Sequence, residues 1–395
     1  MHGPRENLVA LALSSALLVG VVLDAQQQPA PQPIAAARTP SVEVPVAAAA
    51  PDLGSLQEDI GSVLVVSWRG PSISPALRLL LDDGRVGGVL LFASNFSGPA
   101  GLKALSESLK TLASSACLDH PILVMLDQEG GQVNRVQADF AGPSELVAGA
   151  GGADHVRTVE QTAAAGLRGL GVGLDLAPVA DVRTNPRDQV ILDRSFGSSP
   201  AVVSPLVSAA VQGLHDGGVG ATLKHFPGLG GAGGDPHVAI PTDPESEAQW
   251  ERVQMPAFQA GIAAGADAVM TTAVYVPGLG GGNTPAMFSA PVVSRLRTQL
   301  GFNGVIVSDS VSMGGVSARY SLPEATVLAL AAGNDLVLLG SGDPAYEGEA
   351  MASVNAAVIA GRLDRASLHE SAMRVNRLRD RWGGRFLHCR VLKTI

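Results

Sequence analysis

Two pairs of polar residues flank a glycine-rich stretch between residues 224 and 237. Lys224 and His225 follow the apolar run 219–223, which is typical of a buried strand whose end is open to solvent. Asp235 and His237 come after the glycines, and a carboxylate two residues from an imidazole can orient it for proton transfer at neutral pH. Because glycine and proline disfavour a helix between the pairs, we expect a loop that carries a binding pair and a proton-transfer pair.

Asp309 is the candidate nucleophile. It ends the predicted strand 304–309, whose apolar residues are Val305, Ile306 and Val307, so its carboxylate would project from the core into the mouth of a pocket. A carboxylate there could attack the anomeric carbon of a sugar, stabilise a cation or cap the following helix.

Other polar residues follow other apolar runs. Asp127, Arg135 and Arg194, together with Lys224, could form directional hydrogen bonds with the hydroxyl, amide or carboxylate groups of a small ligand. Asp181 also follows an apolar run, and we interpret it as a turn former or helix cap.

Eight short apolar runs must position these residues, and they alternate with Ala- and Leu-rich segments of helical period. The runs lie at 62–68, 86–94, 122–127, 172–182, 220–224, 266–272, 304–309 and 335–340. The helical segments lie at 75–83, 100–113, 159–170, 202–215, 245–264, 290–300, 323–332 and 346–360. This α/β alternation predicts a single (β/α)8 TIM-type barrel with an extra C-terminal helix at 364–382. An open doubly wound sheet is the alternative fold.

The composition limits the partners of the chain. It has 395 residues and a net charge of −9, without a long basic run, so we expect no binding to nucleic acid. Cys117 and Cys389 are too few for a disulfide scaffold or a cysteine-based zinc site. No pair of histidines has the spacing of metal ligands on a helix, and no calcium-loop pattern occurs, so we expect no metal and no cofactor.

The N-terminus predicts export. Residues 8–23 carry no charge and lie between Arg5 and Asp24, a length that suits a signal peptide, with an uncleaved anchor as the alternative. We therefore predict a signal peptide or anchor at 1–25, a disordered Pro/Ala/Gln-rich linker at 26–52, the barrel at 53–384 and a tail without an assigned role at 385–395. The folded part would be secreted, periplasmic or associated with the cell envelope, and an uncleaved apolar segment would tether it to the membrane.

Four sequence blocks carry a family resemblance. They are Asp-Gln-Glu-Gly-Gly at 127–131, Arg-Ser-Phe-Gly at 194–197, Lys-His-Phe-Pro-Gly at 224–228 with Asp-x-His at 235–237, and Gly-Val-Ile-Val-Ser-Asp-Ser-Val-Ser-Met at 304–313. In this order and spacing they resemble glycoside hydrolase family 3, in its β-N-acetylhexosaminidase branch. The resemblance implies a (β/α)8 barrel and a retaining exo-β-N-acetylglucosaminidase that hydrolyses terminal β-linked GlcNAc from peptidoglycan-derived or related glycans.

The resemblance also assigns roles. Asp309 matches the nucleophile that forms the glycosyl-enzyme intermediate, and His237 matches the general acid/base, with Asp235 as its dyad partner. The residues that match the sugar-binding positions are Asp127, Arg135, Arg194, Lys224 and His225. The expected partner is a β-linked GlcNAc-containing glycan, and we expect a monomer.

Four positions depart from the family pattern. Ala273 stands where a histidine is usual, Gln132 where an arginine is usual, Leu229 where a histidine is common, and Pro236 where a small residue is usual. A family 3 β-glucosidase-like hydrolase and a catalytically impaired glycan-binding barrel are therefore alternatives, and phosphorolysis is left open. The β-glucosidase branch generally takes its acid/base from a second domain and has no Asp-x-His segment, which argues against the first alternative.

Overall fold

The computed structural model describes residues 53–116 and 118–384. The predicted signal peptide or anchor, the whole of the predicted linker, both cysteines and the tail from residue 385 lie outside the described residues. Within the described ranges, no helix is both long enough and apolar enough to span a membrane.

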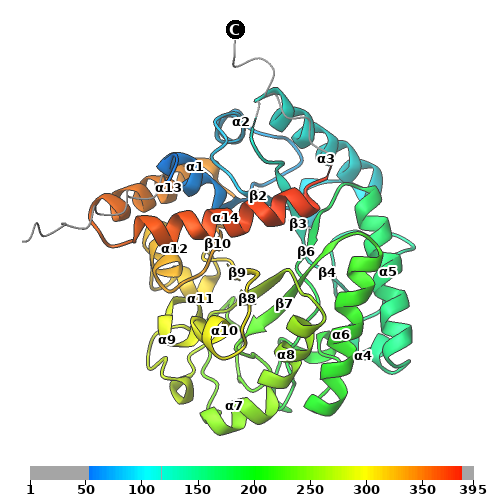
Figure 1. Ribbon diagram of the computed structural model, residues 1–395. Coiled ribbons are helices and arrows are strands. Elements are labelled where there is room, and N and C mark those ends of the chain that lie inside the picture. The colour runs from blue at the N-terminus through cyan, green and yellow to red at the C-terminus, as the bar shows by residue number, and fades with distance from the viewer. Residues whose placement is uncertain (1–52, 117, 385–395) are drawn as a thin grey trace, which may run out of the picture. The chain divides into compact units, whose positions relative to one another are not determined.

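Eight parallel strands form a closed barrel, which confirms the predicted fold (Figure 1). The strands are β1 (Leu64–Val66), β2 (Gly88–Leu90), β3 (Leu123–Leu126), β6 (Leu174–Asp175), β7 (Gly220–Phe226), β8 (Ala268–Thr271), β9 (Val305–Ser308) and β10 (Leu336–Leu338). Each strand pairs with its neighbour in sequence, and β10 closes the barrel on β1, with Val337 opposite Leu64. Every run predicted as a strand overlaps one of the eight, and because the sheet is closed the open-sheet alternative is wrong.

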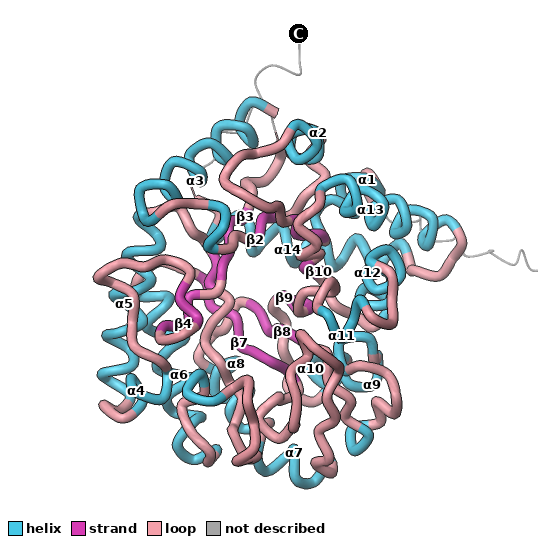
Figure 2. The backbone as a smooth tube through the Cα atoms, turned by 180° about the vertical axis from the view of Figure 1, so that it is seen from behind, coloured by secondary structure: helices cyan, strands magenta, loops and turns pink. Residues whose placement is uncertain are grey.

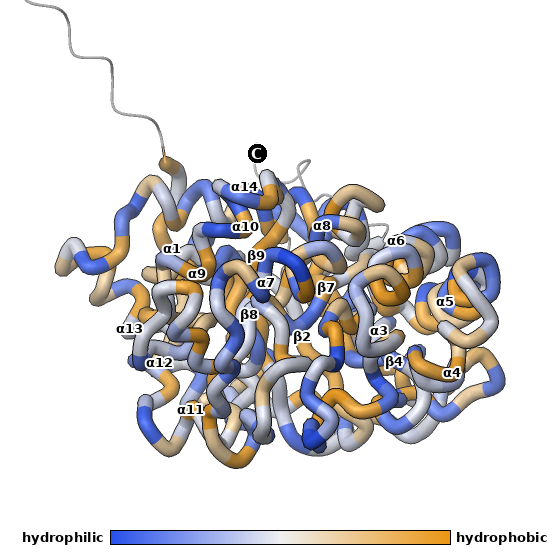
Figure 3. The backbone as a smooth tube through the Cα atoms, turned by 90° about the horizontal axis from the view of Figure 1, so that it is seen from below, coloured by the Kyte–Doolittle hydropathy of each residue, from blue (hydrophilic) through white to orange (hydrophobic). Residues whose placement is uncertain are grey.

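Helices surround the barrel, as the view from behind shows (Figure 2). They are α1 (Leu56–Ser62), α2 (Pro75–Asp82), α3 (Gly98–Ser115), α4 (Glu145–Gly149), α5 (Ala153–Gly169), α6 (Pro200–Asp216), α7 (Glu247–Val253), α8 (Met255–Ala263), α9 (Ala290–Val293), α10 (Arg295–Thr298), α11 (Gly314–Ser317), α12 (Leu322–Ala331), α13 (Pro344–Ile359) and α14 (Arg365–Trp382). Orange and blue segments alternate along α5 and α6, as expected for helices that bury one face (Figure 3).

Two predicted helices are each broken into two. Residues 245–264 form α7 and α8, which meet at Gln254: Pro256, at the start of α8, has no N–H to continue the hydrogen bonds of α7. The buried side chain of Gln254 bonds to the main chain of Val182. Residues 290–300 form the short helices α9 and α10, which meet at Ser294. The antiparallel pair β4 (Gln128–Gly130) and β5 (Val133–Asn134) was not predicted.

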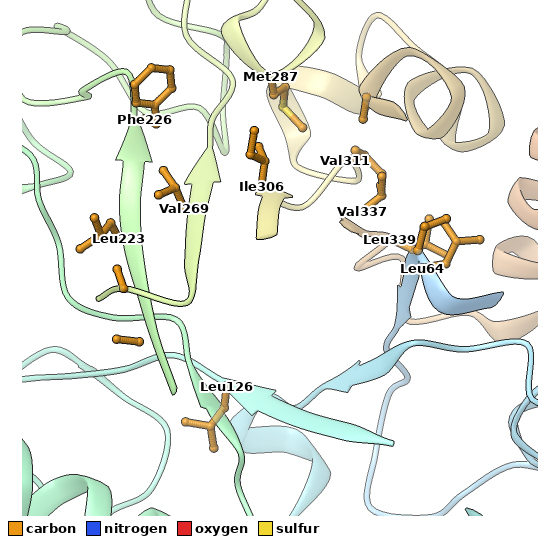
Figure 4. Packing of buried hydrophobic residues seen from close by; sticks show 14 of the residues in the cluster. Leu64, Leu126, Leu223, Phe226, Val269, Met287, Ile306, Val311, Val337 and Leu339 are labelled. Atoms are coloured by element: carbon orange, nitrogen blue, oxygen red, sulfur yellow. The ribbon is translucent and has the colours of Figure 1, made fainter. Parts of the chain in front are cut away.

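Side chains on the strands pack alternately inside and outside the barrel. Leu64, Leu223, Val269 and Ile306 belong to the core between the barrel and its helices (Figure 4). Strand residues that face inward form a second core, which also includes Trp382 from α14. Since Trp382 also touches the strand segments near their N-terminal ends, α14 closes that end of the barrel and leaves the C-terminal end for a site.

Candidate functional site

A pocket of about 160 Å³ lies among residues that follow or end the barrel strands. Its lining includes all the predicted site residues except Asp235, which contacts His237. It also includes Leu90, Phe92, Glu129, Val133, Leu176, Val190, Leu229, Pro236, Met270, Ser310 and Leu338. The pocket is smaller than the roughly 300–1,000 Å³ of sites for drug-sized ligands, so it suits a single small ring.

Lys224 is the centre of a buried cluster of charges. It lies within β7, is 1% exposed, and places its Nζ 2.8 Å from Asp127 Oδ1 and 2.5 Å from Glu129 Oε1. Arg194 binds Glu129 with two hydrogen bonds, at 2.6 Å from Nε and 2.8 Å from Nη2. Arg135 Nη2 lies 3.3 Å from Asp127 Oδ2. Two carboxylates therefore hold three cations in fixed positions around the pocket.

The cluster keeps its carboxylates charged. Burial alone would raise the pKa of Glu129, but Lys224 and Arg194 outweigh it and lower the pKa to about 2. The pKa of Asp127 also lies well below its usual range, because Lys224 and Arg135 outweigh the effect of its burial. Burial would lower the pKa of Lys224, but the two carboxylates raise it. At neutral pH the cluster thus presents fixed charges to a ligand.

Asp181 holds His225 in one orientation. Its Oδ2 lies 2.7 Å from His225 Nδ1, and its carboxylate accepts hydrogen bonds from the backbone N–H groups of His225 and Leu229. Nε2 of His225 lies 3.2 Å from Nη2 of Arg194, which can only donate, so Nε2 accepts and Nδ1 carries the proton. Interpreting Asp181 as a turn former or helix cap was therefore wrong: it is fully buried and orients an imidazole.

Asp309 comes directly after β9 and caps no helix, since the next helix, α11, has Met313 at its N-cap. Its Oδ2 accepts a hydrogen bond from Thr272 Oγ1 at 2.8 Å, and its Oδ1 accepts one from the backbone N–H of Ser310 at 2.8 Å. The carboxylate thus enters the pocket in a fixed orientation.

Asp235 and His237 form the predicted pair on the loop after β7. Asp235 Oδ1 accepts a hydrogen bond from the backbone N–H of His237 and lies 2.8 Å from its Nδ1. The His237 side chain is 67% exposed and also lines the pocket. Since Nδ1 faces the carboxylate, Nε2 is the ring nitrogen left to exchange a proton with a ligand.

The four departures from the family pattern have different surroundings. Leu229 and Pro236 line the pocket, whereas Ala273 is fully buried and does not line it. Gln132 also lies outside the lining, where its Nε2 donates to Asp193 Oδ1 at 2.9 Å. Only the substitutions at 229 and 236 therefore change the wall of the pocket directly.

Sequence reasoning missed several residues of this site. Glu129 lies in the Asp-Gln-Glu block, but nothing in its spacing indicated that it would bind Lys224 and Arg194. Phe92 lies near the end of the apolar run 86–94, and the centroid of its ring lies 6.0 Å from the Arg135 guanidinium carbon. Within residues 53–116 and 118–384, no group of three His, Cys, Asp or Glu side chains could hold a metal ion.

Comparison with known proteins identifies the family. Residues 55–378 match the family described as the glycosyl hydrolase family 3 N terminal domain. The chain is 38% identical over 263 residues to a β-hexosaminidase from Methylobacillus flagellatus, covering 64% of this chain and 73% of that protein. It is 36% identical over 288 residues to a β-hexosaminidase from Xylella fastidiosa, covering 70% and 83%.

Solved structures show the same barrel. A family 3 β-N-acetylglucosaminidase from Paenibacillus sp. matches with a TM-score of 0.80 and 34% identity over 83% of this chain, which spans 62% of that protein. A β-N-acetylhexosaminidase from Beutenbergia cavernae matches with a TM-score of 0.73 and 32% identity, covering 81% of this chain and 97% of that one. The chain therefore belongs to glycosyl hydrolase family 3 and is a glycoside hydrolase.

Proposed function

We propose that the protein is a retaining exo-β-N-acetylglucosaminidase that removes terminal β-linked GlcNAc. The observation that carries this proposal is that Asp309 and the Asp235-paired His237 line one pocket of about 160 Å³. A nucleophilic carboxylate and a separate proton donor are the two groups that a retaining glycosidase needs. Relatives and structural neighbours that are described as β-hexosaminidases or β-N-acetylglucosaminidases support the choice of sugar.

In the first step, the Asp309 carboxylate attacks the anomeric carbon while His237 Nε2 protonates the departing glycosidic oxygen. The hydrogen bonds from Thr272 Oγ1 and Ser310 N–H hold the carboxylate so that it need not reorient during the attack. The products of this step are a glycosyl ester of Asp309 and the free leaving alcohol.

In the second step, His237 Nε2 takes a proton from water, which attacks the anomeric carbon and releases the Asp309 carboxylate. Two inversions leave the configuration of the sugar unchanged. Asp235, 2.8 Å from Nδ1, keeps the ring oriented and stabilises the imidazolium when His237 holds both protons.

The charged cluster binds the sugar in this proposal. Arg135 has its buried Nε without a hydrogen-bond partner among the described residues, and Asp127 and Lys224 line the pocket beside it. Arg194 and His225 complete the polar wall. We propose peptidoglycan-derived or related glycans as the substrates and a location outside the cytoplasmic membrane, which the apolar segment at 8–23 supports.

The decisive experiment compares release of nitrophenol from the β-N-acetylglucosaminide and from the β-glucoside. We expect the wild type to prefer the first and Asp309→Ala to lose turnover on both, while Asp82→Ala, which changes an exposed carboxylate on α2, keeps wild-type activity. His237→Ala should retain activity on leaving groups as good as nitrophenol and lose it on poor ones.

Other outcomes would replace the proposal. Faster release from the glucoside would indicate a β-glucosidase-like enzyme. The absence of release by the wild type between mild acid and mild base would indicate an impaired glycan-binding barrel. Formation of a sugar 1-phosphate in phosphate buffer would indicate phosphorolysis.

A further inference from the structure

The loop that carries His237 touches the chain just beyond Asp309. The backbone N–H of Gly315, in α11, donates a hydrogen bond to the carbonyl of Pro236 at 3.1 Å. Among the described residues, this is the hydrogen bond that ties residues 233–240 to the rest of the chain, since the others formed by this segment are internal to it. The ends of the loop are held separately, through the carbonyls of Gly230 and Pro241.

The contact is too close for a side chain at either glycine of α11. A Cβ placed on Gly314 would lie 2.1 Å from the carbonyl oxygen of His237, and one placed on Gly315 would lie 2.6 Å from the carbonyl oxygen of Pro236. Both distances are below the 3.0 Å that real Cβ atoms keep from heavy atoms. Because the neighbours are backbone atoms, no rotation of a side chain relieves the clash.

The local backbone gives no other reason for glycine at these two positions. Gly314 and Gly315 lie at the start of a helix, and neither has a left-handed φ. In a helix, alanine is favoured over glycine by about 1 kcal/mol. The absence of a side chain therefore serves the approach of the loop.

The same short segment links this contact to Asp309. The carboxylate of Asp309 accepts from the N–H of Ser310, and the N–H of Met313 donates to the carbonyl of Ser310 at 3.2 Å, so the chain turns directly from β9 into α11. A loop that docks on Gly314 and Gly315 is thereby positioned relative to Asp309.

We propose that Gly314 and Gly315 form a docking seat that sets the position of His237 relative to Asp309. They are positioning residues, and this role rests on the proposed function of His237 as the general acid/base. An alanine in the seat would displace the loop while Asp309 and the charged cluster stay in place. The enzyme would then resemble a variant that lacks its acid/base.

The test uses Gly315→Ala and Gly314→Ala, with Gly348→Ala as the matched control, because a Cβ at Gly348 in α13 would meet nothing within 4 Å. The three variants and His237→Ala are assayed with aryl β-N-acetylglucosaminides whose leaving phenols range from dinitrophenol to unsubstituted phenol. For the seat variants we expect kcat/KM on the poorest leaving group to fall at least about tenfold, and by no more than the roughly 10²–10⁴-fold that acid–base catalysis contributes. On dinitrophenol it should change little.

The change in kcat on addition of azide is a second measurement, because a variant with a merely structural defect would not regain activity with azide. Azide attacks the anomeric carbon as the bond to Asp309 breaks, and it gives a β-glycosyl azide without any proton being removed. We expect azide to raise kcat of the seat variants and of His237→Ala, but not of the wild type or Gly348→Ala. Thermal unfolding of each variant shows whether the barrel is intact, and Gly314→Ala, at an exposed position, replaces Gly315→Ala if the latter does not fold.

Two results would overturn the seat. One is a leaving-group dependence like that of the wild type, and the other is an equal loss on all leaving groups without azide rescue. If His237→Ala behaves as expected while the seat variants do not, only the docking seat fails. If His237→Ala itself shows no dependence on the leaving group, the proposed function fails.

Discussion

Thr272 donates a hydrogen bond to Asp309 across the ends of the neighbouring strands β8 and β9, with 2.8 Å between Oγ1 and Oδ2. The backbones are joined at the same level, since the N–H of Asp309 donates to the carbonyl of Thr271 at 2.7 Å. Thr272 is fully buried, so its hydroxyl cannot swing to solvent. Thr272 thus places a hydroxyl directly beside the carboxylate, next to Ala273.

Thr272→Val should therefore reduce catalysis without altering the shape of the pocket. Hydrogen bonds to charged groups contribute about 1.5–3 kcal/mol, so we expect kcat/KM on nitrophenyl N-acetylglucosaminide to fall roughly 10- to 100-fold. Thr272→Ser keeps the hydroxyl and serves as the control, with most of the activity retained. Equal activity of the valine and serine variants would show that the hydrogen bond does not hold a reacting group.

The site residues that could be predicted from the sequence are those that stand at the ends of strands. Asp309 and Lys224 could be found because each stands at the end of an apolar run, and parallel strands in a barrel end at the same face. Glu129 and Asp181 were not recognised, because they bind Lys224 and His225 rather than a ligand. These carboxylates come close to Lys224 and His225 only after folding, and their spacing in the sequence does not indicate the contacts.

The helical periodicity predicted where the outer helices lie, but it did not predict where they are interrupted. The predicted helix 245–264 is broken just before Pro256, which has no N–H for a helical hydrogen bond. At the break, the buried Gln254 bonds to Val182, 72 residues earlier in the chain. The proline could be recognised in the sequence, whereas local periodicity contains no information about a partner as distant as Val182. The β4–β5 pair was not predicted because its strands are only two to three residues long. In addition, β4 begins only two residues after β3 ends, so the two strands were not distinguished.

Lys224→Met should destabilise the fold as well as abolish activity. Removing the ammonium leaves Asp127 and Glu129 buried with less positive charge, and breaking a buried pair on one side costs about 3–5 kcal/mol. Denaturant unfolding at neutral pH measures the loss. The double variant Lys224→Met/Glu129→Gln should recover part of it, because one uncompensated charge is removed. If the double variant is less stable than Lys224→Met, the charge argument is wrong.

Glu129 should support stability only above the acid range. Its folded-state pKa of about 2 is below the roughly 4.3 of an unfolded glutamate, so its contribution is complete above about pH 4.5 and is lost as the pH falls towards 2. We expect the difference in unfolding free energy between the wild type and Glu129→Gln to shrink over that range. Glu349→Gln, which makes the same substitution at an exposed position, is the control. A difference for Glu129→Gln that does not change with pH would contradict the depressed pKa.

Glu160 should act in the opposite direction. This residue of α5 is 6% exposed, and its burial, followed by the charge of Asp175, raises its pKa to about 8. Between about pH 4.3 and 8 the folded state keeps the proton that the unfolded state has lost, so the stability of the wild type falls as the pH rises through this range. Glu160→Gln carries no titratable group.

The unfolding free energy of Glu160→Gln relative to the wild type should therefore increase steadily from pH 5 to pH 8 and level off above it. Urea unfolding at several pH values measures this difference, with Glu107→Gln on the exposed face of α3 as the matched control. Each unit of pKa shift corresponds to about 1.4 kcal/mol, so even half of the indicated shift would be resolved. A difference that stays flat across this range would mean that Glu160 titrates alike in the folded and unfolded chains. It would follow that water reaches its carboxyl group despite the packing of α5 against α6.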